Sequence, residues 1–282
     1  MKNKKLLILG AKGNLGSVLL DIFSDKYEVT AWDFAECDIT DENSLESIKE
    51  LVPDIIINAT GYNDVDKAED EGKEMVYKVN AGAVGNLAKL AKELDSVFVT
   101  YSTDYVFDGE KGSGYTEEDV PSPVSEYGKS KYEGEKLVRE VCEKYYIIRP
   151  SWIFGVDGSG KKSFINLMLD LVVNQGKTHL DVEESSVSSP TYSVDLAKLT
   201  REIIEGEYEY GIYHGSNTGQ CSRYEWAQKM FELKNIKVNI TPVDEDFFPR
   251  TARRPKYSVL LNTKLPASRS WQHALEEYLK TI

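Results

Sequence analysis

The chain has little of the chemistry that metal, redox and membrane proteins use. Its 282 residues include three cysteines and three histidines, and neither set shows the close spacing of metal ligands. The cysteines, Cys37, Cys142 and Cys221, are odd in number and far apart, which predicts reduced thiols in a cytoplasmic protein. No apolar run approaches the ~20 residues of a membrane span. We therefore expect no metal centre, no disulfide framework and no contact with a membrane.

Basic residues are also fewer than acidic ones. Lys and Arg number 34 against 47 Asp and Glu, so the net charge is −13. A nucleic acid or an anionic membrane surface is disfavoured as the main partner, because both attract positive charge. An anionic small ligand remains open, since a single pocket can be positive in an acidic protein. The length allows one large domain or two unequal ones, and a homodimer is also open.

The first half of the chain alternates short apolar runs with segments of helical spacing. Strands are predicted at residues 6–9, 27–33, 54–59, 96–102 and 145–149, and helices at residues 15–23, 41–51, 73–94 and 127–143. This alternation predicts an α/β fold with a Rossmann-like, doubly wound parallel sheet. Residues 1–150 are expected to form a dinucleotide-binding domain.

The second half is less regular. Helices are predicted at residues 163–173, 193–205 and 222–233, and short strands near Leu180, Ile212 and Val238. We expect residues 151–282 to form a smaller α/β substrate-binding lobe, with segments at about 178–205 returning to the first domain.

A glycine-rich loop joins the first predicted strand to the first helix. Its residues are Gly10, Ala11, Lys12, Gly13, Asn14, Leu15 and Gly16. Glycines allow the backbone to approach a pyrophosphate, and the helix N-terminus offers free N–H groups and a positive dipole. The loop therefore predicts dinucleotide binding, although a glycine-rich turn between strand and helix is the plainer alternative.

Two residues give opposite signals about the nucleotide. Asp33 ends the second predicted strand, where a carboxylate accepts hydrogen bonds from a ribose and repels a 2′-phosphate, which favours NADH. Lys12 lies within the loop and could attract that phosphate, which favours NADPH. We expect NADH or NADPH, with a slight preference for NADH because Asp33 would be in direct contact. Asp38 and Ile39 are candidates for the adenine edge, or belong to a turn before the next helix.

Small and polar residues follow the third and fourth predicted strands. Ala59, Thr60, Gly61 and Tyr62 are at the carboxyl end of the third, at the sheet edge where such folds bind ligands, and are expected near the nicotinamide ribose. Thr103 follows the fourth, with Ser102 as the alternative hydroxyl to bind a substrate carbonyl and stabilise its developing charge.

Tyr127 and Lys131 are four residues apart in a predicted helix, so their side chains share one face. A lysine there can bind a cofactor ribose and lower the pKa of a nearby phenol, and such a phenol can protonate a carbonyl. An ordinary solvated pair has the same spacing. The glycine loop and the Ser-Thr pair favour the catalytic interpretation.

Several motifs in the same order along nearly the whole chain resemble the extended short-chain dehydrogenase/reductase superfamily and, within it, the dTDP-4-dehydrorhamnose reductase family. They are found at residues 10–16, 65–69, 102–109, 123–131, 149–152, 189–192 and 254–260. The resemblance implies Thr103, Tyr127 and Lys131 as the catalytic residues. It also implies that Val65, Tyr105 and Trp152 lie near the sugar, and Asp104 is a further candidate for binding the substrate. Without the resemblance, Trp152 would suggest core packing.

One segment departs from the family pattern. Residues 185–190 read Ser-Ser-Val-Ser-Ser-Pro where the family often has Asp-Gln-x-Gly-x-Pro, which leaves the exact sugar and nucleotide open. Arg253 and Arg254 are candidate clamps for a diphosphate, because arginine matches phosphate with two parallel donors.

The resemblance implies NAD(P)H-dependent reduction of the 4-keto group of a nucleotide-linked deoxy sugar. A non-catalytic cofactor-binding subunit that regulates a partner enzyme is an alternative, as is a reductase or epimerase of another nucleotide sugar. Dehydration is disfavoured because Tyr105 stands where related dehydratases have an acidic residue.

Overall fold

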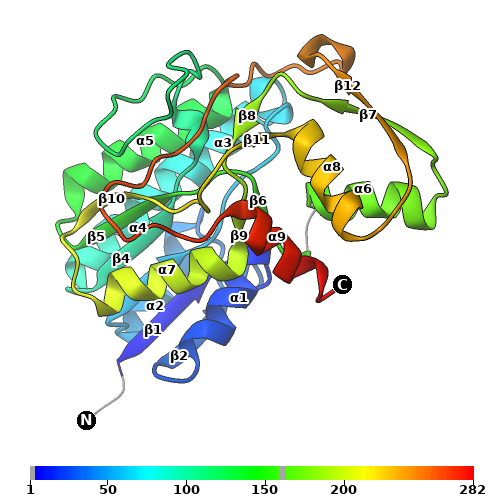
Figure 1. Ribbon diagram of the computed structural model, residues 1–282. Helices are drawn as coiled ribbons and strands as arrows, with labels where there is room; N and C mark the ends of the chain where they lie inside the picture. The colour runs from blue at the N-terminus through cyan, green and yellow to red at the C-terminus, as the bar shows by residue number, and fades with distance from the viewer. Residues whose placement is uncertain (1–3, 159–162) are drawn as a thin grey trace.

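The computed structural model describes residues 4–158 and 163–282 (Figure 1). Within these ranges a six-stranded parallel sheet has the order β10-β5-β4-β3-β1-β2. Its strands are β1 (Lys5–Leu9), β2 (Glu28–Trp32), β3 (Ile55–Asn58), β4 (Val97–Tyr101), β5 (Tyr145–Arg149) and β10 (Gly211–His214). The chain passes from β1 outward to β2 and then to β3 on the other side of β1. The carboxyl ends of β1 and β3 therefore form the switch point where such sheets bind ligands.

Helices cover both faces of the sheet, so its central strands, such as β1 and β3, are nearly continuous apolar runs. The helices are α1 (Asn14–Phe23) and α7 (Ser193–Glu205) on one face and α2 (Glu42–Leu51), α4 (Val84–Glu93) and α5 (Glu126–Val141) on the other. Successive β1 residues alternate between the two cores: Leu6 and Ile8 pack against α1 and α7, and Leu7 and Leu9 against the opposite helices. The doubly wound α/β fold predicted from the sequence is thus confirmed.

A second group of elements packs at one end of the sheet. It contains α6 (Phe164–Leu169), β7 (His179–Glu183), α8 (Arg223–Leu233), β12 (Asn239–Val243) and α9 (Trp271–Leu279). β12 pairs in parallel with β7, and Trp226 and Met230 of α8 are buried in a shared core with α9. Two short strand pairs lie between the groups: β6 (Ile153–Phe154) with β9 (Thr191–Tyr192), and β8 (Val187–Ser188) with β11 (Cys221–Ser222).

Several predicted segments differ in detail. The helix expected over residues 73–94 consists of α3 (Lys73–Tyr77), a π-helical stretch (Lys78–Ala83) and α4. The helix expected over residues 163–173 is shorter in the structure: α6 ends at Leu169, and a π-helical stretch (Asp170–Asn174) follows it.

The segment at 178–205 divides between the two groups. Its helix, α7, packs against α1 on the sheet, whereas its strand, β7, pairs with β12 away from the sheet. The strand that joins the sheet is β10, beyond the predicted range. No helix was predicted where α9 lies.

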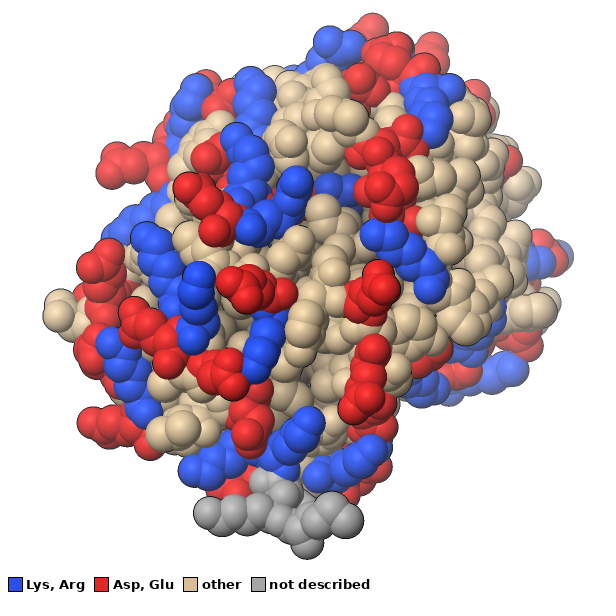
Figure 2. Space-filling view, turned by 90° about the vertical axis from the view of Figure 1, so that its left-hand side faces the viewer, with Lys and Arg blue, Asp and Glu red and all other residues tan. Residues whose placement is uncertain are grey.

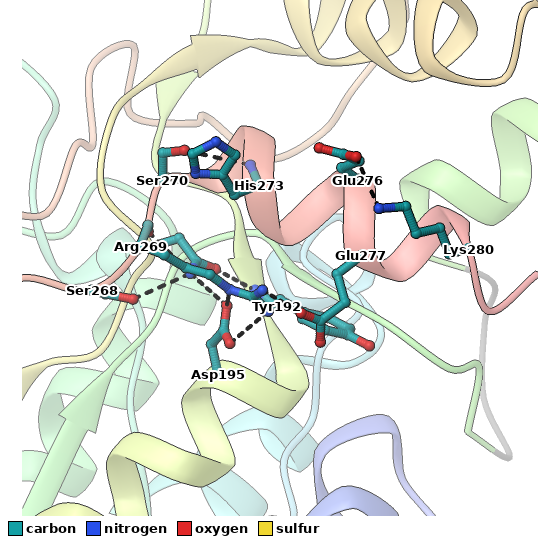
Figure 3. A network of polar contacts seen from close by, with 10 residues as sticks. Tyr192, Asp195, Ser268, Arg269, Ser270, His273, Glu276, Glu277 and Lys280 are labelled. Atoms are coloured by element: carbon teal, nitrogen blue, oxygen red, sulfur yellow. Dashed lines mark hydrogen bonds and ion pairs between the residues drawn. The ribbon is translucent and has the colours of Figure 1, made fainter.

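A polar network joins the last helix to the sheet (Figure 3). The guanidinium of Arg269, just before α9, donates from Nε and Nη2 to the two carboxylate oxygens of Asp195 on α7, each at 2.8 Å. Asn217 also donates to Asp195, at 2.7 Å, and Glu277 of α9 pairs with Arg269. Burial acts to lower the pKa of Arg269, but the carboxylates of Asp195 and Glu277 outweigh it and raise the pKa. The network links α9 to α7.

Figure 2 shows acidic and basic side chains interspersed over one face of the molecule. Among residues 4–158 and 163–282, no helix is both long and apolar enough to cross a membrane. The same ranges contain no group of three or more His, Cys, Asp or Glu arranged to hold a metal ion.

Candidate active site

Tyr127 and Lys131 project from one face of α5 into a cavity of about 440 Å³, which we call the reaction cavity. The helix begins after Ser125, whose hydroxyl accepts the Gly128 N–H at 3.1 Å. Thr103, at the end of β4, lines the same cavity. The three predicted catalytic residues therefore meet at the carboxyl ends of the strands, as the sequence suggested.

The Tyr127 side chain is half-buried in this cavity. Burial raises its pKa, and a hydrogen bond with Thr103 opposes that shift. The phenol therefore keeps its proton at neutral pH, as a proton donor must. The expected lowering of this pKa by Lys131 is not found, because the other side chains that shift it are Asp104 and Tyr105, and both raise it.

Lys131 is buried in the same cavity. Its Nζ donates to the Tyr101 carbonyl at 3.1 Å, and burial lowers its pKa to about 8 against the opposing effect of the Glu135 carboxylate. A Cβ on Gly61 would lie 2.9 Å from Nζ. The glycine after β3 thus leaves room for the ammonium at the place where a nicotinamide ribose is expected.

A buried ion pair fixes α5 to the sheet. Glu135 continues the series Tyr127 and Lys131 by one more helical turn, and its carboxylate receives two hydrogen bonds from Arg149 at the end of β5, at 2.8 and 2.6 Å. Both side chains are 1% exposed. Sequence reasoning missed this pair, although an arginine ending an otherwise apolar strand is a signal for a buried partner.

Asp104 was expected to bind substrate, and the structure gives its carboxylate a different role. It lines the reaction cavity, but it is 2% exposed and accepts hydrogen bonds from hydroxyls of the protein itself. Ser258, Ser151 and Ser188 donate to Oδ2 at 2.5, 2.9 and 3.1 Å, and Thr103 donates to Oδ1 at 3.1 Å. Asp104 therefore holds Thr103 in place.

The departure from the family pattern contributes to this arrangement. Ser188, one of the donors to Asp104, occupies the position of the family glycine in the segment at 185–190. Ser102, the alternative hydroxyl, also lines the reaction cavity. Its buried oxygen has no hydrogen-bond partner among the described residues, so it remains a second possible donor to a substrate.

The glycine loop borders a cavity of about 730 Å³ at the carboxyl ends of β1 to β3, which we call the cofactor groove. Gly10 has φ +79°, and a Cβ on it would lie 3.0 Å from the Ala59 carbonyl. A Cβ on Gly16 would lie 2.0 Å from the Gly10 carbonyl oxygen. No side chain of the described residues caps the start of α1, where Gly158 packs closely against Gly13 and Asn14. A helix start of this kind offers backbone N–H groups to an anion. These features fit a dinucleotide pyrophosphate.

Most of the predicted cofactor residues line this groove or the reaction cavity beside it. Those in the groove are Gly10, Gly13, Asn14, Asp33, Asp38, Ile39, Ala59, Thr60 and Gly61, and Leu15 lines the reaction cavity. Lys12 and Tyr62 line neither, and Gly16 packs beneath the loop. Tyr62 points elsewhere, because a Cβ on Gly72 would lie 2.1 Å from its hydroxyl.

Asp33 is the polar side chain that ties the loop to β2. Its carboxylate accepts the backbone N–H of Lys12 at 2.8 Å and that of Phe34 at 2.9 Å. The Lys12 side chain is exposed and does not line the groove. Of the two residues that favour opposite cofactors, only Asp33 therefore faces the groove. Asp38 lines the groove and accepts the Thr40 N–H at 2.9 Å in a local turn.

Two apolar residues of the groove were missed. Phe34 is 74% exposed and Met75 is 47% exposed, and both line the groove beside Asp33. Exposed apolar side chains at the mouth of a cavity suit the flat face of an adenine. The signal for Phe34 was its position directly after the acidic residue at the strand end.

A third cavity, of about 710 Å³, adjoins the reaction cavity and is called the substrate cavity here. Val65, Tyr105 and Trp152 line both cavities, so the residues expected near the sugar form the boundary between them. Trp152 has φ +42°, a strained conformation that is found most often at functional sites.

The two predicted arginine clamps differ in position. Arg254 lines the substrate cavity, but its Nη2 pairs with Asp66 at 2.6 Å. Arg253 is exposed, pairs with Glu110 at 3.2 Å and lines none of the three cavities. Arg223, which sequence reasoning did not single out, also lines the substrate cavity.

Comparison with known proteins agrees with this site. The family described as RmlD substrate binding domain matches residues 4–282. A dTDP-4-dehydrorhamnose reductase of Aggregatibacter actinomycetemcomitans is 38% identical and covers 96% of this chain and 97% of the relative. One from Mycolicibacterium smegmatis is 36% identical over 99% of this chain and 86% of the relative.

A solved structure is similar along the whole chain. The dTDP-4-dehydrorhamnose reductase of Bacillus anthracis, crystallised in complex with NADP, has a TM-score of 0.94 and 35% identity and covers all of both chains. Its cofactor class matches the groove described above. On its sequence, its fold and the match over residues 4–282, the chain belongs to the RmlD substrate binding domain family.

Proposed function

We propose that the protein reduces the 4-keto group of dTDP-4-dehydrorhamnose with NAD(P)H to give dTDP-L-rhamnose. The observation that carries the proposal is the meeting of Thr103, Tyr127 and Lys131 in one cavity with the end of the glycine loop. The names of the relatives support the same substrate. The substrate cavity, separated from Tyr127 by Trp152 and Tyr105, offers room for the nucleotide part.

Each residue then has a role that follows from its surroundings. The loop backbone and the start of α1 hold the pyrophosphate, and Lys131 binds the nicotinamide ribose beside Gly61. When bound, NAD(P)H supplies the hydride. Tyr127 donates its phenolic proton to the keto oxygen as negative charge develops there. Thr103 donates its hydroxyl proton to Asp104 in the structure, and with substrate bound it turns that proton toward the keto oxygen and positions it.

For the nucleotide, we infer that Asp33 sets the ratio between NADH and NADPH. Its carboxylate faces the groove and would repel a 2′-phosphate, which supports a preference for NADH. Against this stands NADP in the Bacillus anthracis reductase. A carboxylate held by two backbone N–H groups is partly neutralised, so both cofactors are expected to work.

The direct test is to mix the purified protein with dTDP-4-keto-6-deoxy-L-mannose and to follow the oxidation of NADH and NADPH in separate assays. Consumption of either cofactor with formation of dTDP-rhamnose supports the proposal. UDP-linked keto sugars serve as the comparison. Absence of turnover with both cofactors, in a preparation that binds them, would contradict it and favour a regulatory cofactor-binding role.

A further inference from the structure

Arg223, the first residue of α8, stacks on aromatic rings at the wall of the substrate cavity. Its Cζ lies 3.7 Å from the centroid of the Trp152 ring, 4.9 Å from that of Phe164 and 5.2 Å from that of Trp226. A guanidinium stacked on a ring keeps its N–H donors in its own plane, directed outward from the stack. The stack therefore fixes the position of the group without using its donors.

The guanidinium of Arg223 has no hydrogen-bond or ion-pair partner among residues 4–158 and 163–282. Burial lowers its pKa to about 10, so it is still a cation at neutral pH. The carboxylates of Glu183 and Asp104 act on this cation electrostatically, but neither forms an ion pair with it, and a partly buried cation without a directly paired anion costs stability. Such an arrangement is expected where a ligand brings the missing negative charge.

The other arginines of the substrate cavity are placed differently. Arg254 already has Asp66 as its partner. Arg250 is exposed, and its Cζ lies 6.0 Å from the Phe248 ring centroid. Arg223 thus combines a fixed position with unused donors.

The position of Arg223 matches one part of the proposed substrate. Trp152 lines both the reaction cavity and the substrate cavity, and Arg223 stacks on it. In a nucleotide sugar, the diphosphate is attached at C1, across the ring from the keto carbon at C4. A sugar that presents C4 to Tyr127 and lies against Trp152 would direct its diphosphate into the substrate cavity.

We propose that Arg223 binds the diphosphate of the nucleotide sugar through its free N–H donors and so makes the site select a nucleoside diphosphate over a monophosphate. The inference rests on the proposed function for the orientation of the substrate. It assigns anion recognition to α8, whereas the sequence suggested Arg253 and Arg254 as the diphosphate clamps.

The test compares the affinities of dTDP and dTMP by titration calorimetry. The protein is expected to bind dTDP more tightly than dTMP. Arg223→Met keeps an apolar chain on the rings but has no charge, and it should weaken dTDP binding by at least about tenfold while changing dTMP binding less. Arg139→Met is the matched control, because Arg139 is exposed on α5 and lines none of the three cavities.

Arg223→Lys is the second variant, to be measured if Arg223→Met does not fold. It keeps the charge but loses the two-pronged geometry, so it should lower the dTDP to dTMP preference by a smaller factor. Affinity for NADPH, measured by fluorescence, should be unchanged in both variants. A parent-like preference in the variant that folds, or no preference for dTDP in the parent, would overturn the inference.

The result also separates this inference from the proposed function. Loss of dTDP preference in Arg223→Met, together with no turnover by the parent, supports the anion site and contradicts the reductase. Turnover by the parent with an unchanged dTDP preference in Arg223→Met contradicts the anion site alone.

Discussion

Replacing Glu135 by Gln should destabilise the protein more than any surface substitution. The change keeps the size of the side chain but leaves the cationic Arg149 without its counter-charge, at a position that is 1% exposed. Arg149 is already under-satisfied, since its Nη1 has no partner in the described residues. Removing one member of a buried pair costs about 3–5 kcal/mol, a large part of a total stability of about 5–15 kcal/mol.

The second half of this prediction concerns the doubly substituted protein. Glu135→Leu combined with Arg149→Met replaces the pair by apolar groups of similar volume, which is often neutral or stabilising. We therefore expect the double variant to recover most of the stability that Glu135→Gln loses. Without Glu135, however, the Lys131 ammonium loses the carboxylate that supports its charge, so the basic limb of the activity profile should move to lower pH.

Urea unfolding followed by tryptophan fluorescence and far-UV circular dichroism measures these differences. The midpoint should fall in Glu135→Gln with little change in the slope of the transition. Exposed Glu140→Gln on the same helix is the control. A Glu135→Gln variant within about 1 kcal/mol of the parent, or a double variant less stable than the single one, would refute the reasoning.

Three further predictions concern Lys131, Asp33 and Arg269. Burial lowers the pKa of Lys131 from its ordinary 10.5 to about 8 in the folded protein, so the unfolded state binds more protons between these pH values. The stability of the protein should therefore rise with pH across that window. Lys131→Met should remove this rise in urea unfolding, stabilise the protein by up to about 3 kcal/mol at pH 7 and abolish most turnover; a variant no more stable than the parent contradicts this. Asp33→Asn should shift the kcat/KM ratio of NADPH to NADH upward by about tenfold, and an unchanged ratio would show that Asp33 does not set the preference. Arg269→Met should lower stability by about 1–3 kcal/mol, seen as a lower thermal midpoint, because it leaves Asp195 without its two charged donors; an unchanged midpoint would show that the network of Figure 3 does not hold α9 in place.

The first half of the fold could be predicted because its signals are local. Continuous apolar runs such as residues 6–9 and 54–59 belong to strands buried on both faces, and glycines follow β1 where the chain turns into α1. The spacing of Tyr127 and Lys131 on one helix, and the position of Thr103 after a strand, are likewise local.

The roles of several site residues could not be predicted, because they depend on contacts between segments that are far apart in the sequence. Asp104 looked like a substrate residue until Ser151, Ser188 and Ser258, brought from three other segments, were seen to surround its carboxylate. Whether an arginine faces a cavity or a surface carboxylate also depends on packing, which is why Arg253 was favoured over Arg223. No local pattern records such arrangements.

The central claim is that hydride transfer to C4 of the sugar is completed by a proton from Tyr127. The most direct measurement follows the reduction of dTDP-4-keto-6-deoxy-L-mannose by C4-deuterated NADPH, with the parent and with Tyr127→Phe. The account predicts deuterium at C4 of the parent's product, a rate at least about 100-fold lower for Tyr127→Phe, and unchanged cofactor affinity in that variant. Deuterium at another carbon, or reduction by Tyr127→Phe at the parent rate, would contradict it.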